Sequence, residues 1–220
     1  MLALPLSRGP RVLLALAASL ALAGIGDSGL LVSAPRLPEG RTLSVGTAGG
    51  ASGGEGSGFV SAVWQVAPRL ALTAGLSYLD ATSSPFAGLR LGLLDGLSLE
   101  ARVKSEGFEP DGAEVEGAAL FGLSLGRIDL LASATAGYGE STWDVEGAGA
   151  VRAMLGHVVD AGLEGRYRTT PDGSRYDLVA GPTVGVTLAG GAVRIQLLVG
   201  FGGNEQRSGP AAFAGLSVLQ

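Results

Sequence analysis

Along most of its length the chain alternates between small or apolar residues and polar or charged ones. The stretch "VVDAGLEGRYR", Val158 to Arg168, shows this pattern clearly. One set of alternate positions, from Val159 to Tyr167, is small or apolar throughout, and the set between them carries both acids and bases. Because successive side chains of a β-strand point to opposite faces, the pattern predicts a strand with one apolar and one charged face.

Period-two alternation continues from residue 41 to the end of the chain, interrupted by clusters of Gly, Pro, Asp and Ser. Such a pattern is typical of strands and turns, and helical signals are nearly absent after residue 40. The predicted strands are 41–49, 58–66, 69–79, 87–94, 97–105, 113–125, 128–138, 142–155, 158–169, 175–188, 192–202 and 210–219. The sequence therefore predicts an all-β fold of about twelve strands.

The predicted connections alternate in length. The segments "APR", "LDG", "GR", "GH" and "AGG" are tight turns, whereas "GGASGGEGSG", "DATSSPF", "SEGFEPDG", "GEST", "TPDGS" and "GGNEQRSG" are mostly longer and more polar. An antiparallel up-and-down transmembrane barrel has short turns at one end and longer loops at the other, which gives this order. An even strand number also lets the sheet close and leaves no unpaired edge.

Six aromatic residues are predicted where a strand meets a long connection, each on the apolar side of its strand. They are Tyr78, Tyr138, Trp143, Tyr167, Tyr176 and Phe201. Rings at this place are typical of the aromatic girdle of a membrane barrel, and Trp64 is the best candidate for the opposite girdle. Core aromatics placed by chance are the alternative, but such residues need not gather at one end of their strands.

The N-terminal residues have the features of a secretory signal. Arg8 and Arg11 precede the apolar run Val12 to Ala23, which ends in an A-x-A cleavage site. The run is shorter than the roughly 20 residues that a membrane helix needs. We therefore expect a signal peptide over 1–23, a periplasmic lead or a plug folded back into the barrel over 24–40, and the barrel over 41–220.

Composition excludes several classes of function. The chain has no cysteine, a formal charge of -5 and 46% hydrophobic residues. Without cysteine the chain has no thiolate chemistry, and it has no basic stripe that would bind a nucleic acid. Its share of hydrophobic residues is too high for a disordered chain. The single histidine, His157, lies in a tight turn where no catalytic triad can be built around it. We expect no enzyme activity, no cofactor and no metal site.

The charged residues fall on the side of the strands predicted to face the barrel interior. The bases are Arg90, Arg102, Lys104, Arg152, Arg166, Arg168 and Arg194. The acids are Glu100, Glu114, Glu116, Asp129, Asp144, Glu146, Asp160, Glu164 and Asp177. The first three strands present small neutral residues there instead, namely Ser44, Gly46, Ser61, Gln65, Thr73, Gly75 and Ser77.

The tight turns set the predicted register, with Leu93 opposite Leu97 and Leu155 opposite Val159. The resulting neighbours are Arg90 with Glu100, Lys104 with Glu114, Arg102 with Glu116, Glu146 with Arg168, and Arg152 between Asp160 and Glu164. Opposite charges on neighbouring strands stabilise each other. The sequence therefore predicts an interior with a ladder of ion pairs on one side and small residues on the other.

Together, the signal-like N-terminus, the alternating strands, the order of connections and the aromatic rim resemble a bacterial outer-membrane β-barrel protein, from about Thr42 to the end. The resemblance implies an outer-membrane location, the lipid bilayer as partner, and no nucleic acid. It implies a narrow passive channel for small solutes or, alternatively, a closed structural barrel that anchors or docks other envelope proteins. A soluble barrel would instead place the apolar residues inside.

The chain departs from this resemblance at its C-terminus. It ends in "GLSVLQ", whereas such proteins usually end in an aromatic residue. In the last strand, Phe213 falls on one face, and Leu216 and Val218 fall on the other. The sequence therefore leaves the twelfth strand open.

Overall fold

The computed structural model describes residues 31, 37, 43–52, 55–79, 82–105, 112–139, 142–170, 173 and 176–219. The predicted signal peptide lies outside the described residues, and in the segment 24–40 only Leu31 and Leu37 are described. No helix among the described residues is long and apolar enough to cross a membrane.

Twelve antiparallel strands make up nearly all of the described chain. Their bounds are β1 Leu43–Ser52, β2 Glu55–Ala67, β3 Leu70–Leu79, β4 Thr82–Leu94, β5 Leu97–Ser105, β6 Ala113–Leu125, β7 Ile128–Gly139, β8 Thr142–Met154, β9 Val159–Thr169, β10 Tyr176–Leu188, β11 Val193–Asn204 and β12 Ser208–Leu219. A short 3-10 helix, η3 (Ala189–Gly191), connects β10 to β11. The predicted strand order and strand count are confirmed.

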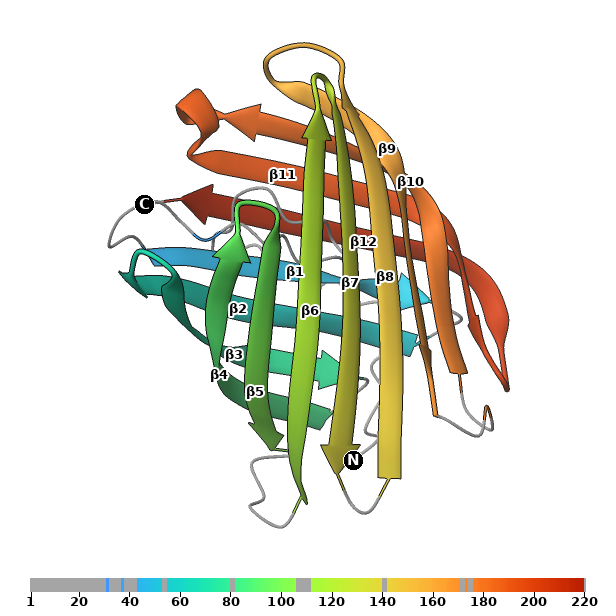
Figure 1. Cartoon of the computed structure of the whole chain (residues 1–220). Coiled ribbons are helices and arrows are strands. Elements are labelled where there is room, and N and C mark those ends of the chain that lie inside the picture. Colours follow the sequence, from blue (N-terminus) through green and yellow to red (C-terminus); the bar gives the residue numbers. More distant parts are fainter. Residues whose placement is uncertain are drawn as a thin grey trace, which may run out of the picture.

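Each strand pairs with its neighbours in the sequence, and β12 pairs with β1 to close the barrel. The closing seam runs from Ser44 opposite Leu219 to Ser52 opposite Ala211, so the strand that the sequence left open is a full member of the wall. In Figure 1, β6, β7 and β8 run upright whereas β1, β2 and β12 cross the view steeply inclined to them. This inclination follows from the tilt and twist that closure requires.

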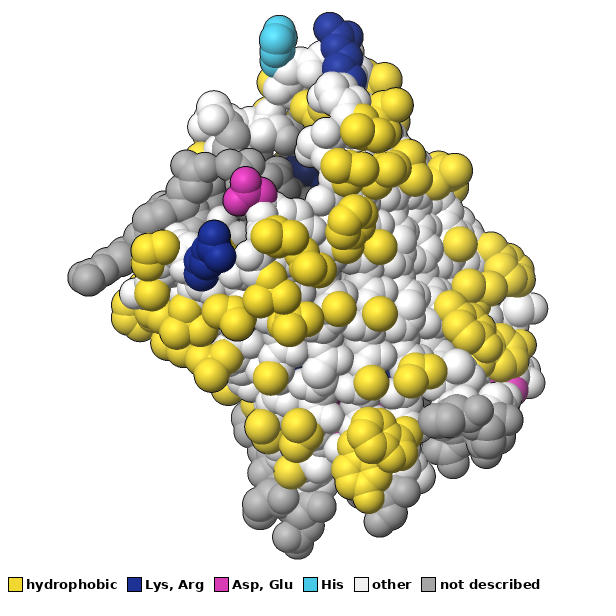
Figure 2. Space-filling model, viewed as in Figure 1, with side chains coloured by type: hydrophobic (Ala, Val, Ile, Leu, Met, Phe, Trp, Pro, Cys, Tyr) yellow, Lys and Arg dark blue, Asp and Glu magenta, His cyan; other side chains and the backbone are white. Residues whose placement is uncertain are grey.

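The two faces of the wall differ as predicted. In β9, Leu163 is 64% exposed and Tyr167 is 46% exposed, whereas Glu164 between them is 3% exposed. Figure 2 shows hydrophobic side chains spread over the outside of the barrel, with charged ones near the turns. The alternative of a soluble barrel with its apolar face inside is therefore wrong.

The predicted alternation of long and short connections is only partly right. Residues 106–112 and 170–175 are the longer connections, both at the predicted end. The other predicted loops shorten because strand pairing continues into them, with Ser52 opposite Glu55 and Leu79 opposite Thr82. Small and polar residues keep the extended backbone there, and hydrophobic alternation alone does not reveal such extensions.

Candidate functional site in the barrel interior

The predicted interior charges lie on the enclosed face of the wall, where they fall into two groups by burial. The buried ones are Arg90, Glu100, Arg152, Asp160, Glu164 and Arg194. Those half-buried are Arg102, Lys104, Glu114, Glu116, Asp129, Asp144, Glu146, Arg166, Arg168 and Asp177. Alternation produces this placement, because each of these residues is flanked along its strand by residues of the outer face.

The first part of the charged interior is a ladder across β4, β5 and β6. Arg90 Nη2 lies 2.6 Å from Glu100 Oε2, Arg102 Nε lies 2.8 Å from Glu116 Oε2, and Lys104 Nζ lies 3.1 Å from Glu114 Oε2. These pairs stand directly opposite each other in the register. The three predicted neighbour pairs are confirmed.

One turn that led to this register was predicted wrongly. Leu94, not Leu93, stands opposite Leu97, because the register shifts by one residue between Gly92 and Leu94. A β-bulge absorbs the extra residue next to the turn and leaves the rest of the ladder unchanged. Arg90 therefore still faces Glu100.

The ladder continues over β7 and β8 to Arg168. Arg168 forms an ion pair with Asp144, and its Nη2 also lies 3.9 Å from Glu114 Oε1. Gly137 lies between these carboxylates, where a methyl group would stand 2.5 Å from Asp144 Oδ1 and closer still to Glu114 Oε1. The missing side chain at Gly137 is thus what lets the two acids approach each other across β7.

The predicted pairing of Glu146 with Arg168 is right for the backbone and wrong for the side chains. The two residues are opposite each other in the register, and Arg152 is opposite Gly162, between Asp160 and Glu164 as predicted. The Arg168 head nevertheless contacts Asp144, and Glu146 Oε2 lies 3.9 Å from Arg166 Nε. Long side chains in a twisted sheet reach the diagonal neighbour as readily as the direct one.

A separate, buried ion pair links β9 to β11 across β10. Arg194 Nη2 on β11 lies 2.7 Å from both carboxylate oxygens of Asp160 on β9, and both residues are buried. Gly185 stands between them, and a methyl group there would lie 2.5 Å from Asp160 Oδ2 and 2.9 Å from Arg194 Nη2. As at Gly137, a glycine in the intervening strand makes room for charges from the strands on either side.

The sequence did not predict an interior apolar patch formed by Phe59, Val179, Leu198, Ala211 and Phe213. The last four are buried and packed together, and Phe59 packs against them. They lie on the interior side of their strands, and the only sequence signal was that β10 to β12 are apolar on both faces. In the wall predicted to be small and neutral, Gln65 and Thr73 are buried as expected, but so are the apolar side chains of Val63 and Ala71.

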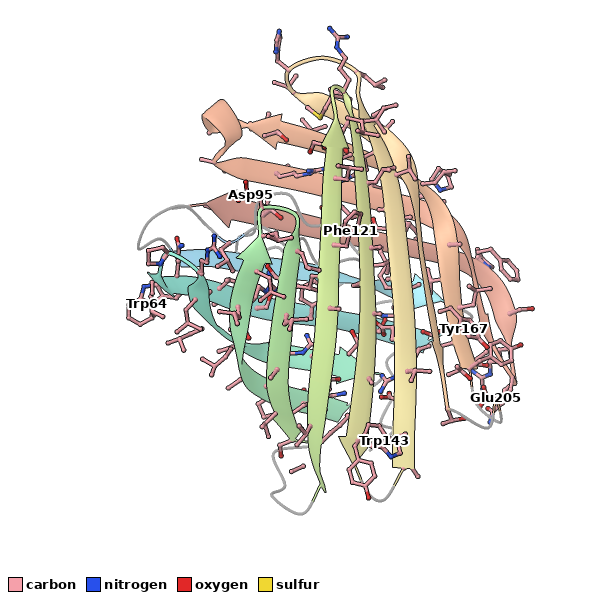
Figure 3. The ribbon with its side chains drawn as sticks, in the orientation of Figure 1. Trp64, Asp95, Phe121, Trp143, Tyr167 and Glu205 are labelled. Carbon is pink, nitrogen blue, oxygen red and sulfur yellow. The ribbon has the colours of Figure 1, made fainter. Side chains whose placement is uncertain are left out.

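The predicted aromatic girdle is exposed on the outer face. Tyr138 and Trp143 are in contact with ring centroids 4.9 Å apart, and Tyr167 and Tyr176 stack at 6.3 Å. Phe201 is exposed too, while the side chain of Tyr78 lies outside the described residues. Figure 3 places Trp143 at the foot of β8 and Trp64 at the left edge of the barrel.

His157 is exposed in the connection between β8 and β9, away from the charged interior. Within the part of the chain that the structure describes, no group of three or more His, Asp or Glu residues is arranged to hold a metal ion.

A closed up-and-down barrel with an apolar outer face, a charged inner face and an aromatic rim has the outer-membrane β-barrel fold. No protein-family model matches the chain, and no curated protein sequence matches it.

Solved structures of this fold do match. An outer membrane channel from Pseudomonas putida F1 aligns with a TM-score of 0.59 at 14% identity, over 88% of this chain and 99% of the other. The KdgM porin aligns with a TM-score of 0.57 at 9% identity, over 79% and 96%. The NanC porin aligns with a TM-score of 0.56 at 6% identity, over 80% and 98%. At these identities the likeness concerns the fold.

Proposed function

We propose that this protein resides in the outer membrane of a bacterium and works there as a narrow passive channel for small solutes. The observation that carries the proposal is the closed twelve-stranded wall with apolar side chains outside and acidic and basic side chains inside. Lipid tails suit the outer face, and water or polar solutes suit the inner one. The proposal includes a signal peptide over 1–23 for export and no enzyme activity or cofactor.

The lining residues of the proposed channel carry both signs of charge. Interior bases and acids neutralise each other along the ladder from Arg90 to Asp144 and in the pair of Arg166 with Asp177, whose Nη2 and Oδ2 atoms lie 2.6 Å apart. Selective pores instead present rings of one sign to the passing ion. We therefore propose weak preference between cations and anions. Solved structures that share the fold include two named porins, which supports the same class of function.

A second candidate function is a closed structural barrel that anchors or docks other envelope proteins. It is favoured by the burial of Arg90, Asp160, Glu164 and Arg194, whose side chains have few water-accessible atoms. Tightly paired charged side chains occupy part of the barrel interior and so leave less room for a channel. Twelve strands fall between the small barrels that side chains fill and the large ones that leave a clear channel.

Conductance of the purified full chain in a planar lipid bilayer distinguishes the two functions. We expect stepwise open-channel currents, with a reversal potential close to zero across a KCl gradient because neither sign of charge dominates the lining. A heat-dependent shift in gel mobility serves as the control that the barrel is folded. A folded protein that gives no current steps would contradict the channel and favour the structural barrel.

A further inference from the structure

The interior apolar patch has no role in a channel that conducts through its charged wall. Val179, Leu198, Ala211 and Phe213 are at most 5% exposed, although they lie on the face where the neighbouring strands carry ions. Apolar surface facing a water-filled bore is unfavourable, and covering it is favourable. The low exposure of these residues shows that something covers them.

One residue that covers the patch comes from the N-terminal part of the chain itself. Leu31 packs against the cluster of Val179, Leu198, Ala211 and Phe213. Its backbone N–H also donates a hydrogen bond of 2.5 Å to Oε1 of Glu164, the buried acid of β9. Leu31 therefore meets the barrel wall in two ways, through an apolar side chain and through a polar backbone group.

The other described residue of the same segment, Leu37, lies near the inner face of β4. Its Cδ1 atom would be 3.4 Å from a methyl group built on Gly92, close to the turn that joins β4 to β5. Of two points of the chain six positions apart, Leu31 thus contacts the wall on β9 to β12, and Leu37 lies near the inner face of β4. Both residues precede the first strand.

We propose that the interior apolar patch and Glu164 form an internal binding site for Leu31, so that this residue, tethered through the chain to β1, acts as a plug inside the barrel. The side chain of Leu31 packs against the patch, and its backbone N–H donates a hydrogen bond to the Glu164 carboxylate. The effect on conduction rests on the proposed channel function, but the occupancy of the interior does not. The plug is thereby preferred over a lead that stays free in the periplasm.

The test is a cysteine cross-link in the full chain, which has no cysteine of its own. Leu31→Cys is combined with Ala211→Cys or Val179→Cys, whose side chains face the interior. The matched controls combine it with Ala212→Cys or Ala180→Cys, the next residues along the same strands, which are exposed on the outer face. Folded protein in detergent is treated with a mild oxidant, and the disulfide is measured by mass spectrometry.

We expect rapid cross-linking with at least one interior partner and little with either exterior one. Two interior partners are used because one of them could disturb the patch. Equal cross-linking of interior and exterior pairs, or none with the interior pairs, overturns the proposal and leaves the patch for a different occupant, such as an apolar solute.

Conductance then separates the plug from the channel function. Reducing the interior disulfide should raise the current several-fold, and so should Leu31→Asp, which sets a carboxylate against both the apolar patch and Glu164. Cross-linking with no current in any state supports the plug and contradicts the channel. Current steps without interior cross-linking support the channel and contradict the plug.

Discussion

At the scale of single residues, two glycines determine which charges meet inside the barrel. Gly137 separates Glu114 from Asp144, and Gly185 separates Asp160 from Arg194, in each case so closely that a methyl group would displace the ends of the charged side chains. Opposite charges are usually paired between adjacent strands, but here Arg194 reaches Asp160 over β10, and Arg168 lies 3.9 Å from Glu114 over β7 and β8. The glycines therefore allow separate cross-strand pairs to join into networks. The register of adjacent strands alone does not predict these networks.

Replacing Gly137 by alanine tests this role. The new methyl group must displace the carboxylate ends of Glu114 and Asp144, which can swing aside, so we expect Gly137→Ala to weaken the ion pair of Asp144 with Arg168 and to lower the free energy of unfolding by up to about 1 kcal/mol. Gly147→Ala is the matched control, since a methyl group there meets nothing within 4 Å. Urea unfolding in detergent micelles, followed by tryptophan fluorescence, gives both values. Equal effects of the two substitutions would show that Gly137 has no special role.

Glu100 is the residue on which the buried end of the ladder depends. It pairs with Arg90, and its Oε1 accepts a hydrogen bond of 3.1 Å from Thr73 Oγ1. Because the Glu100 side chain is 4% exposed, Glu100→Gln removes a buried negative charge that faces the Arg90 guanidinium. We expect a loss of about 3–5 kcal/mol in the free energy of unfolding.

The comparison for that measurement is Glu146→Gln. The Glu146 side chain is 28% exposed and lies 3.9 Å from Arg166, so its loss should change the free energy of unfolding by less than about 1 kcal/mol. The same urea unfolding assay serves both variants. If Glu100→Gln is as mild as Glu146→Gln, water reaches the ladder and the burial of Arg90 carries little energy.

At the scale of elements, strand register is what brings the charges together, and a charge swap tests it. Arg166 on β9 and Asp177 on β10 form an ion pair at 2.6 Å, diagonally across the two strands. Arg166→Asp alone places an acid beside Asp177 and Glu146 and should destabilise the barrel by roughly 1 kcal/mol. Adding Asp177→Arg should recover most of that loss in the same unfolding assay. A double variant no more stable than the single one would contradict the contact.

Strands and register were predictable because both depend on local alternation and on short turns. The ranges of β5 and β6 were predicted to the residue, and the neighbours Arg102 and Glu116 followed from them. Loop lengths were not, because small or polar residues such as Ser57, which pairs with Gly50, extend the strands without an apolar signal. The β-bulge at Leu93 was not predictable either, because it changes the pairing of one residue without changing the hydrophobic pattern of the sequence.

The interior was predictable where its residues are charged and not where they are apolar. A charge between two apolar residues shows which way it points, as for Glu164 between Leu163 and Gly165. Phe213 and Leu198 give no such contrast because their neighbours are also small or apolar. The partner of Arg168 was missed for another reason, since the reach of a long side chain along a twisted sheet is not set by register alone.

At the scale of the whole molecule, the sequence predicted the wall but not what the wall encloses. The alternation of outer and inner residues recurs from strand to strand, so local sequence patterns predict both faces of the barrel wall. The position of Leu31 depends instead on one segment meeting β9 to β12, far away in the sequence. No periodicity encodes such a contact, and the sequence accordingly left both a free lead and a plug open for residues 24–40.

The seam between β1 and β12 sets an order on how the barrel can form. Each of the other ten strands finds its partners among its neighbours in the sequence, but β1 must wait for β12, which is the last strand of the chain. Contacts between such distant residues form slowly, because a long loop must be ordered before they are made. Until then β1 and the latest strand have free hydrogen-bonding edges, to which other chains can add. The passage from open sheet to sealed cylinder is therefore the step at which the protein most needs protection from aggregation.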